Sequence, residues 1–371
     1  MKTNPHVIRQ QQLHQILKRE RLNALALNPG PDLSYLTGLD FHLMERPVLG
    51  LFSPKQDPVF VLPELEMGKL ADLPFPTQTF PYSEDRSTWP QAFQDAFQQA
   101  GLQKGRVGVI PRRLRVLELQ FLETAASSVD FVDGQEAMSA LRILKDQHEI
   151  KSMQKAANIA QHAFQAIQPL IKPGITEKEI AAALVGSLYN AGSDPDLPFF
   201  PIVSFGSNSA NPHAAPTDRP LDETQLVLID WGATVDGYYS DITRTWRTGN
   251  MDKELLEIAR VVQIANQTGR EAVQPGILCS EVDRHVREVI EKSGYGEYFI
   301  HRTGHGLGRE AHEEPYIASD DHTPLKAGMT FTIEPGIYLP GRGGVRVEDD
   351  ILVTEEGCRS FTDLPRELRV L

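Results

Sequence analysis

Hydrophobic residues in the first third of the chain follow two periodicities. Apolar positions recur at helical spacing from Val7 to Arg21 and again from Trp89 to Ala100. Three short apolar runs predict strands at Ala24–Leu27, Val59–Leu62 and Val107–Ile110. Helices that alternate with strands indicate an α/β layer, and reactive side chains are not concentrated in this part of the sequence.

A longer helical pattern, rich in Ala, Lys, Gln, Ile and Met, runs from Ala137 to Leu170. The chain has 371 residues, more than one ordinary hydrophobic core supports, so we expect two domains. The best junction is the start of this pattern, in SALRILKDQHEIKSMQKAANIA. We therefore predict domains at 1–137 and 138–371.

The second domain is expected to combine β hairpins with further helices. Pro173-Gly174 ends the long helical pattern, and TEKE, from Thr176 to Glu179, predicts the capped start of another helix. Beyond it the chain becomes a series of β runs, with helical patterns near Lys253–Gln267 and Cys279–Lys292.

One of these hairpins places two aspartates together. In LVLIDWGATVDGYYSDITRTW two apolar runs flank Asp236-Gly237, which favours a tight turn. With the turn there, Asp230 lies opposite Thr243, and Asp241 is two positions away on the same face. Buried carboxylates that close repel each other unless a cation lies between them, so the hairpin predicts a cation site. The alternative is two unrelated aspartates at strand ends.

A second pair of acidic residues repeats the arrangement. FTIEPGIYLPGRGGVRVEDD places Glu334 at the end of one strand and Glu348 on the next, with a Pro- and Gly-rich loop between them. Arg346 shares the face of Glu348, two residues earlier. We expect Arg346 either to orient a ligating carboxylate or to form an ordinary cross-strand ion pair.

Histidines supply the remaining candidate chemistry. His305, in HRTGHGLGREAHEEP, lies between glycines that allow close backbone approach, and its imidazole is a candidate nitrogen ligand. His312 is a candidate for polarising a scissile carbonyl, and His213, in NSANPHAAP, for contacting substrate or moving a proton. A histidine such as His213 is more often structural. His301 is given no role.

Four carboxylates and one imidazole form a donor set that suits two adjacent divalent cations better than one, because bridging carboxylates neutralise the charge. This set predicts metal-assisted hydrolysis. Oxygen-rich donors favour Mn²⁺, while Co²⁺, Zn²⁺ and Fe²⁺ also fit. The candidate ligands are Asp230, Asp241, His305, Glu334 and Glu348.

Composition indicates which partners and which cellular compartment fit this chemistry. A formal charge of −13 argues against nucleic acid or an anionic membrane as the main partner. Cys279 and Cys358 are too few for a disulfide framework, which indicates a reducing compartment. No apolar run approaches the length of a membrane span, and the first residues lack a signal-peptide core. We therefore expect a cytoplasmic enzyme.

The order Asp, Asp, His, Glu, Glu, with its flanking residues, resembles the superfamily of creatinase, aminopeptidase P, prolidase and methionine aminopeptidase. The resemblance extends from about Ala137 to the end of the chain. The first third, with PDLSYLTGLD, resembles the smaller N-terminal domain of the creatinase and prolidase branch, which methionine aminopeptidases normally lack. The expected fold class is α/β (α+β): a C-terminal pita-bread catalytic domain preceded by a smaller creatinase-type α/β domain.

The resemblance also implies how the cations are held. Asp230 is expected to bind one cation, and His305 and Glu334 the other. Asp241 and Glu348 are expected to bridge both, with a shared water as the nucleophile.

Roles in substrate handling are implied as well. Glu334 is expected to accept and donate the proton, and His213 and His312 to line the cleft. Thr243 and Tyr239 are expected to support the ligands.

Within the superfamily, GHGLG followed by HEEP is more similar to prolidases than to the larger aminopeptidases P. The expected reaction is hydrolysis of the bond before proline in an Xaa-Pro dipeptide; the alternative is an Xaa-Pro aminopeptidase acting on longer peptides. Some prolidases have an Arg after the HExP motif that binds the dipeptide carboxylate, and this chain has Tyr316 there. Arg342 and Arg46 are candidate replacements. Family members are usually homodimers, so Arg46 is expected to act across the dimer.

Two other interpretations keep the same fold. One is a metal-free binding scaffold, and the other is a hydrolase or lyase acting on a small non-peptide amide. Metal-free relatives replace the ligands, whereas all five ligand positions are intact here. The intact set therefore argues against a metal-free scaffold and against a metal-free, creatinase-type hydrolase. A metal-dependent lyase, or a metal-dependent hydrolase of a small non-peptide amide, stays an alternative.

Overall fold

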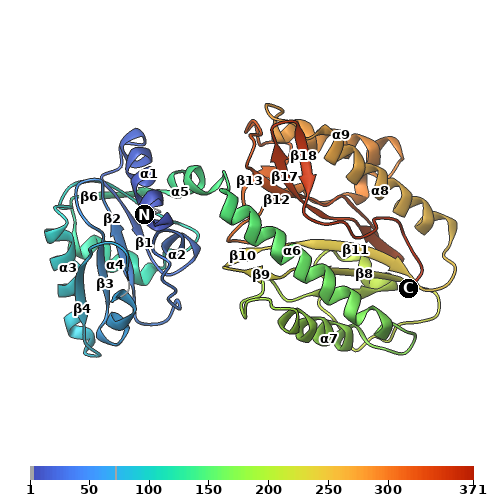
Figure 1. Ribbon diagram of the computed structural model, residues 1–371, viewed down its shortest axis with the longest axis horizontal. Coiled ribbons are helices and arrows are strands. Elements are labelled where there is room, and N and C mark those ends of the chain that lie inside the picture. Colours follow the sequence, from blue (N-terminus) through green and yellow to red (C-terminus); the bar gives the residue numbers. More distant parts are fainter. Residues whose placement is uncertain (1–3, 72) are drawn as a thin grey trace. The chain divides into compact units, whose positions relative to one another are not determined.

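The computed structural model describes residues 4–71 and 73–371. The chain forms two compact units, Met1–Arg142 and Ile143–Leu371 (Figure 1). Helix α5 (Gln135–Arg142) spans residue 137, the domain limit predicted from the sequence. Its buried residues Ala137, Met138 and Leu141 belong to the core of the first unit, which therefore continues to Arg142. No helix in the described part of the chain is both long enough and apolar enough to span a bilayer.

The N-terminal unit is a six-stranded mixed sheet with helices on both faces, in the strand order β4-β3-β2-β1-β5-β6. Helices α3 and α4 pack on one face, and α1, α2 and α5 on the other. Along β1 the side chains alternate accordingly: Ala24 and Ala26 belong to the first core, and Leu25 and Leu27 to the second. The elements are α1 (Pro5–Arg19), β1 (Ala24–Leu27), α2 (Pro31–Thr37), β2 (Leu49–Phe52), β3 (Val59–Pro63), β4 (Gln78–Tyr82), α3 (Trp89–Gln99), β5 (Gly105–Val109), α4 (Val116–Ala125) and β6 (Val129–Asp133).

The first half of the C-terminal unit is a helix pair on an antiparallel sheet. Helices α6 (Gln147–Ile167) and α7 (Glu177–Asn190) pack on β7 (Ile202–Phe205), β8 (Leu226–Trp231) and β11 (Ile242–Arg247). A small hairpin of β9 (Thr234–Val235) and β10 (Tyr238–Tyr239) lies between β8 and β11 in sequence.

The single helix predicted from Ala137 to Leu170 is in fact two helices, α5 and α6. The Asp146 carboxylate accepts hydrogen bonds from the backbone N–H groups of His148 and Glu149. The Glu149 side chain accepts in return from the Asp146 N–H at 2.8 Å. This reciprocal cap starts a new helix at residue 147 and separates it from α5.

The second half repeats the arrangement. Helices α8 (Lys253–Ala272) and α9 (Cys279–Lys292) pack on a five-stranded antiparallel sheet, in the order β13-β12-β14-β17-β18, and on the hairpin β15-β16. Figure 1 shows α6 and α7 with β8 and β11, and α8 and α9 beside β17 and β18. The strands are β12 (Gly304–Gly306), β13 (Glu313–Ile317), β14 (Thr330–Ile333), β15 (Gly336–Leu339), β16 (Gly343–Arg346), β17 (Asp349–Thr354) and β18 (Gly357–Ser360).

Two helix pairs, each covering an antiparallel sheet, form the pita-bread fold, so the predicted fold class is confirmed. The two halves meet at a backbone bridge between Thr243 and Glu348. Candidate ligands from both halves are adjacent to this bridge. Five 3-10 helices complete the described elements: Glu64–Leu70, Arg86–Thr88, Gln168–Leu170, Gly206–Ala210 and Gly296–Tyr298.

Candidate metal centre

The hairpin predicted around Asp236-Gly237 is present. Both residues have positive φ angles, 53° and 71°, as a tight two-residue hairpin turn requires. Beyond the turn, Thr243 of β11 pairs with Asp230 of β8, which is the predicted register. Asp230 and Asp241 are both buried, so the hairpin brings two acidic side chains into the interior.

The second half contributes His305 and two glutamates. His305 lies at the centre of β12, between β13 and β14. A Cβ atom on the preceding Gly304 would lie 1.8 Å from the carbonyl oxygen of Thr332, so only glycine allows this close strand approach. The backbone N–H of Glu334 donates to the Thr303 carbonyl at 2.8 Å. Two neighbouring strands thus position His305 and Glu334 side by side.

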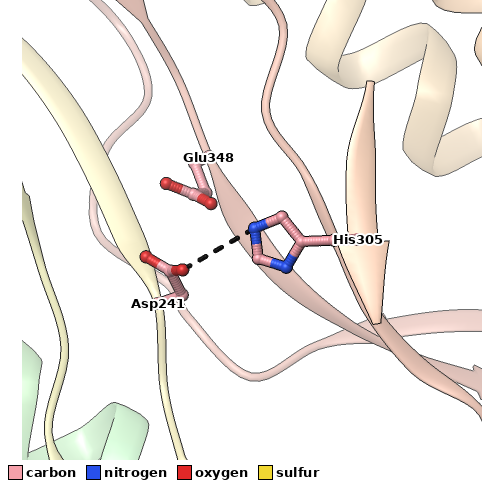
Figure 2. Close-up of side chains that lie close together, drawn as sticks. All are labelled: Asp241, His305 and Glu348. Carbon is pink, nitrogen blue, oxygen red and sulfur yellow. Dashed lines mark ion pairs between the residues drawn. The ribbon is translucent and has the colours of Figure 1, made fainter. Parts of the chain in front are cut away.

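Three of the candidate ligands converge from the two halves (Figure 2). A carboxylate oxygen of Asp241, one of Glu348 and a ring nitrogen of His305 all lie within 4.8 Å of one another. The Nε2 atom of His305 is 3.9 Å from Asp241 Oδ2 and 3.3 Å from Glu334 Oε1. All five predicted ligands, Asp230 included, line one cavity of about 540 Å³.

The electrostatics of the cluster favour the binding of cations. Burial, reinforced by neighbouring carboxylates, raises the pKa of Asp241 and of Glu348 well above the usual range. Burial also raises the pKa of Glu334 to about 7. The pKa of His305 is lowered well below its usual value, again chiefly by burial, which favours the neutral, metal-binding imidazole.

Unsatisfied acceptors in the cluster fit divalent cations. Among the residues that the structure describes, the buried Oδ1 atoms of Asp230 and Asp241 have no hydrogen-bond partner. Leaving a buried acceptor unpaired costs about 1–3 kcal/mol, and more when it is charged. A cation ligated by these oxygens removes that cost and the repulsion between the carboxylates, so the donor set fits a pair of divalent metal ions.

Arg346 contacts Asp230 in the cluster. Its Nη2 donates to Asp230 Oδ2 at 2.6 Å, its Nε donates to Thr243 Oγ1 at 3.0 Å, and its Nη1 donates to Tyr338 Oη at 2.9 Å. Thr243 in turn donates to Glu348 Oε2 at 2.5 Å. The guanidinium therefore contacts Asp230 directly and Glu348 only through Thr243.

Comparison with known proteins identifies the family of this chain. The sequence profile of metallopeptidase family M24 matches residues 151–355, and that of the creatinase/prolidase N-terminal domain matches residues 9–144. The chain belongs to metallopeptidase family M24. As an M24 peptidase it is an enzyme of a metal-dependent class, and the buried cluster is the candidate position of the divalent ions.

Similar proteins span nearly the whole of this M24 chain. An Xaa-Pro dipeptidase of Lactobacillus helveticus is 34% identical over 340 residues, covering 91% of this chain and 92% of the relative. A dipeptidase structure from Pyrococcus horikoshii OT3 matches with a TM-score of 0.92 and 37% identity, covering 98% and 100% of the two chains. A prolidase structure from Thermococcus sibiricus matches with a TM-score of 0.94 and 31% identity, covering 100% of both.

Both histidines predicted to handle substrate line the same cavity of the M24 unit. The ring centroids of His312 and His305 are 4.1 Å apart. His301, to which the sequence assigned no role, lines the cavity as well, and its Nε2 is 2.9 Å from Tyr338 Oη. In the sequence, the one signal that His301 belongs to the site is its position four residues before His305. Tyr338 gives no such signal, because its sequence context is that of any tyrosine in a buried strand.

The remaining predicted residues lie in different surroundings. Tyr239 donates its backbone N–H to the Gly308 carbonyl at 2.8 Å and does not belong to the described cavity lining. Tyr316 pairs with His305 across β12 and β13. Arg342 is exposed, forms ion pairs with two acidic residues and is also outside the described cavity lining. Its two acidic contacts are Asp252, at 3.1 Å, and Glu254.

Arg46, the second candidate for the dipeptide carboxylate, belongs to the N-terminal unit. Its guanidinium forms an ion pair with Glu84 at 2.9 Å and a longer one with Glu45 at 3.6 Å. Within its own unit the charge of Arg46 is therefore already balanced.

Proposed function

We propose that this M24 peptidase is an Xaa-Pro dipeptidase that hydrolyses the bond before proline with two divalent cations. The observation that carries the proposal is the convergence of five metal-binding side chains, from both halves of the fold, in one cavity. The similarity to an Xaa-Pro dipeptidase and to a prolidase structure supports the substrate class.

The ligand assignment that we propose follows from proximity. Asp241 and Glu348 would serve both cations, since both lie close to His305 and to each other. His305 and Glu334, 3.3 Å apart, would hold one cation, and Asp230 would hold the other. When bound, the cations polarise the scissile carbonyl and lower the pKa of water. We propose Mn²⁺ because four of the five donors offer oxygen, with Co²⁺, Zn²⁺ and Fe²⁺ as competitors.

The other cavity residues act on substrate and protons. A Glu334 pKa near 7 suits a group that takes up and releases a proton at neutral pH. His312 and His213 line the cavity and donate hydrogen bonds to the carbonyl undergoing attack. Arg346 holds Asp230 in place through the hydrogen bond at 2.6 Å.

The cellular setting and the assembly are also proposed. We propose a cytoplasmic homodimer. The free thiols of Cys279 and Cys358 are in keeping with a reducing compartment. Light scattering of the purified protein tests the dimer, and a monomer at micromolar concentration contradicts it.

The deciding experiment compares substrates of different length. Metal content is measured first, and then proline release from Ala-Pro and Leu-Pro is compared with loss of the first residue from Ala-Pro-Ala. We expect turnover of the dipeptides only, with Leu-Ala as the control lacking proline. Tyr316, in place of the arginine of some prolidases, favours the alternative of an Xaa-Pro aminopeptidase, which predicts turnover of the tripeptide. A protein without metal and without turnover contradicts both.

A further inference from the structure

Two arginine side chains are among the described residues that line the catalytic cavity, Arg302 and Arg346. All three guanidinium nitrogens of Arg346 are committed to protein acceptors, including Asp230 and Thr243. Arg346 therefore has no free pair of N–H groups with which to form two parallel hydrogen bonds to a ligand carboxylate.

Arg302 differs from Arg346 in its surroundings. Its Nη2 lies 3.4 Å from His312 Nδ1, and its guanidinium carbon lies 4.4 Å from the centroid of the Tyr316 ring. Within residues 4–71 and 73–371, no carboxylate forms an ion pair with Arg302. A half-buried cation that contacts a ring face and an imidazole leaves most of its five donors available.

We propose that Arg302 binds the C-terminal carboxylate of the dipeptide substrate, and that Tyr316 is a positioning residue that supports the guanidinium. This inference rests on the proposed dipeptidase function. A planar guanidinium pairs with a carboxylate through two parallel hydrogen bonds, which makes it a selective receptor for that group. An aromatic ring beneath the guanidinium stabilises the cation without occupying its donor edge.

Covalent geometry restricts where the receptor for the carboxylate can lie. Three bonds separate the scissile carbonyl carbon from the carboxylate carbon of a C-terminal proline, a distance of at most about 4 Å. The receptor must therefore share a cavity with the metal ligands, as Arg302 does. Arg342 instead forms ion pairs with acidic residues outside that cavity.

Strand register explains why the Tyr316 ring lies on the same side of the sheet as the metal ligands and can support Arg302. Tyr316 lies directly opposite His305 in the β12–β13 pair, and paired residues project from the same face of a sheet. The ring that supports Arg302 is therefore on the ligand face of the sheet. Arg302 precedes His305 by three residues. Both partners of the Arg302–Tyr316 contact are therefore in, or next to, strands of the metal centre.

The test separates the carboxylate from the rest of the substrate. The holoenzyme and its Arg302→Met variant are assayed on Ala-Pro and on Ala-prolinamide, which differ only in the charge at the C-terminus. We expect kcat/KM for Ala-Pro to fall roughly 10- to 100-fold, mainly through KM, with a change below about 3-fold for the amide. Inhibition by L-proline should weaken in parallel. Arg342→Met, at an exposed ion pair, is the matched control and should match wild type.

Further variants test whether a loss of activity comes from a loss of structure. Arg302→Lys keeps the positive charge but not the fork of two donors, so kcat/KM for Ala-Pro should be intermediate. Tyr316→Leu should raise KM for Ala-Pro several-fold and leave Ala-prolinamide unchanged. Metal content and thermal unfolding of each variant should match wild type.

The outcomes distinguish a failure of the carboxylate assignment from a failure of the proposed dipeptidase function. If wild type hydrolyses Ala-Pro and Arg302→Met does so equally well, or if the variant loses Ala-Pro and the amide to the same extent, the carboxylate assignment alone is overturned. If wild type hydrolyses neither substrate with metal bound, the proposed function fails, and the assignment fails with it.

Discussion

Thr243 and Glu348 join the two halves of the catalytic unit through both backbone and side chain. The Glu348 N–H donates to the Thr243 carbonyl at 3.0 Å, and the Thr243 hydroxyl donates to Glu348 Oε2 at 2.5 Å. The same hydroxyl accepts from Arg346 Nε at 3.0 Å. Thr243 thus connects a candidate bridging ligand with the arginine that orients Asp230, so the metal centre depends on the junction between the halves.

Replacing Thr243 by the isosteric Val tests this connection. The variant should keep the fold but leave Glu348 Oε2 and Arg346 Nε without their buried partner. Loss of a hydrogen bond to a ligating carboxylate typically lowers metal affinity 10- to 100-fold, so we expect a loss of about 10-fold or more in Mn²⁺ titrations. Thr243→Ser, which retains the hydroxyl, is the control, and equal affinities of Val and Ser variants would contradict the role.

The bridging assignment predicts different metal stoichiometries for different ligands. Glu348→Ala should lose both cations, because a shared ligand serves each of them, whereas His305→Ala should lose one. Metal per chain is measured by mass spectrometry after dialysis. Glu356→Ala, at an exposed position, is the control. Full stoichiometry and turnover in Glu348→Ala would show that Glu348 does not bridge.

The pH dependence of the metal-free protein should reveal the burial of Glu334. Its pKa of about 7 in the folded state exceeds the ordinary value of 4.5, so the folded protein holds a proton that the unfolded chain releases. The free energy of unfolding should therefore fall as pH rises from 4.5 to 7, by up to about 1.4 kcal/mol per pH unit from this group. Denaturant titrations from pH 5 to 8 on chelator-treated protein measure the slope.

A variant isolates this contribution from other titrating groups. Glu334→Gln cannot ionise, so its stability should decline less over the same pH interval than that of wild type. Saturation of wild type with Mn²⁺ should also flatten the decline, since a bound cation favours the ionised carboxylate. Parallel curves for wild type and Glu334→Gln would mean that Glu334 ionises normally.

His213→Ala tests the division between metal ligands and substrate-handling residues. His213 is an exposed residue of the cavity lining and lies outside the cluster of Asp241, His305 and Glu348. We expect kcat to fall roughly 10²-fold or more while metal content stays unchanged. His162→Ala, an exposed position on α6, provides the control. Loss of metal in His213→Ala would instead make His213 a ligand.

Local patterns predicted a large part of this protein correctly. The register of Asp230 opposite Thr243 followed from the Asp236-Gly237 turn, because a two-residue turn and a side-chain period of two leave one pairing. The limits of β1 and α9 followed equally well from periodicity and flanking residues. The donor types in the two hairpins predicted a cation site because buried carboxylates need compensating charge.

Some features depended on contacts between residues far apart in the sequence. Arg342 and Arg302 both lie in short segments next to strands, and nothing local distinguishes the one that forms ion pairs with Asp252 and Glu254 from the one beside the cavity. The place of His301 in the cavity lining, and its contact with Tyr338, 37 residues away, likewise depended on the tertiary structure.

The sequence by itself determined the hairpin that pairs Asp230 with Thr243, which follows from turn chemistry and periodicity acting over a few residues. It also determined the class of fold, through the family resemblance of its motifs, and it supplied the candidate donor residues. The tertiary structure decided that Asp241 and Glu348, 107 positions apart, meet within 4.8 Å of His305. It also decided that Arg302, which has no carboxylate partner among the described residues, lines the same cavity. Such contacts depend on how whole sheets pack, and no spacing along the chain encodes that packing.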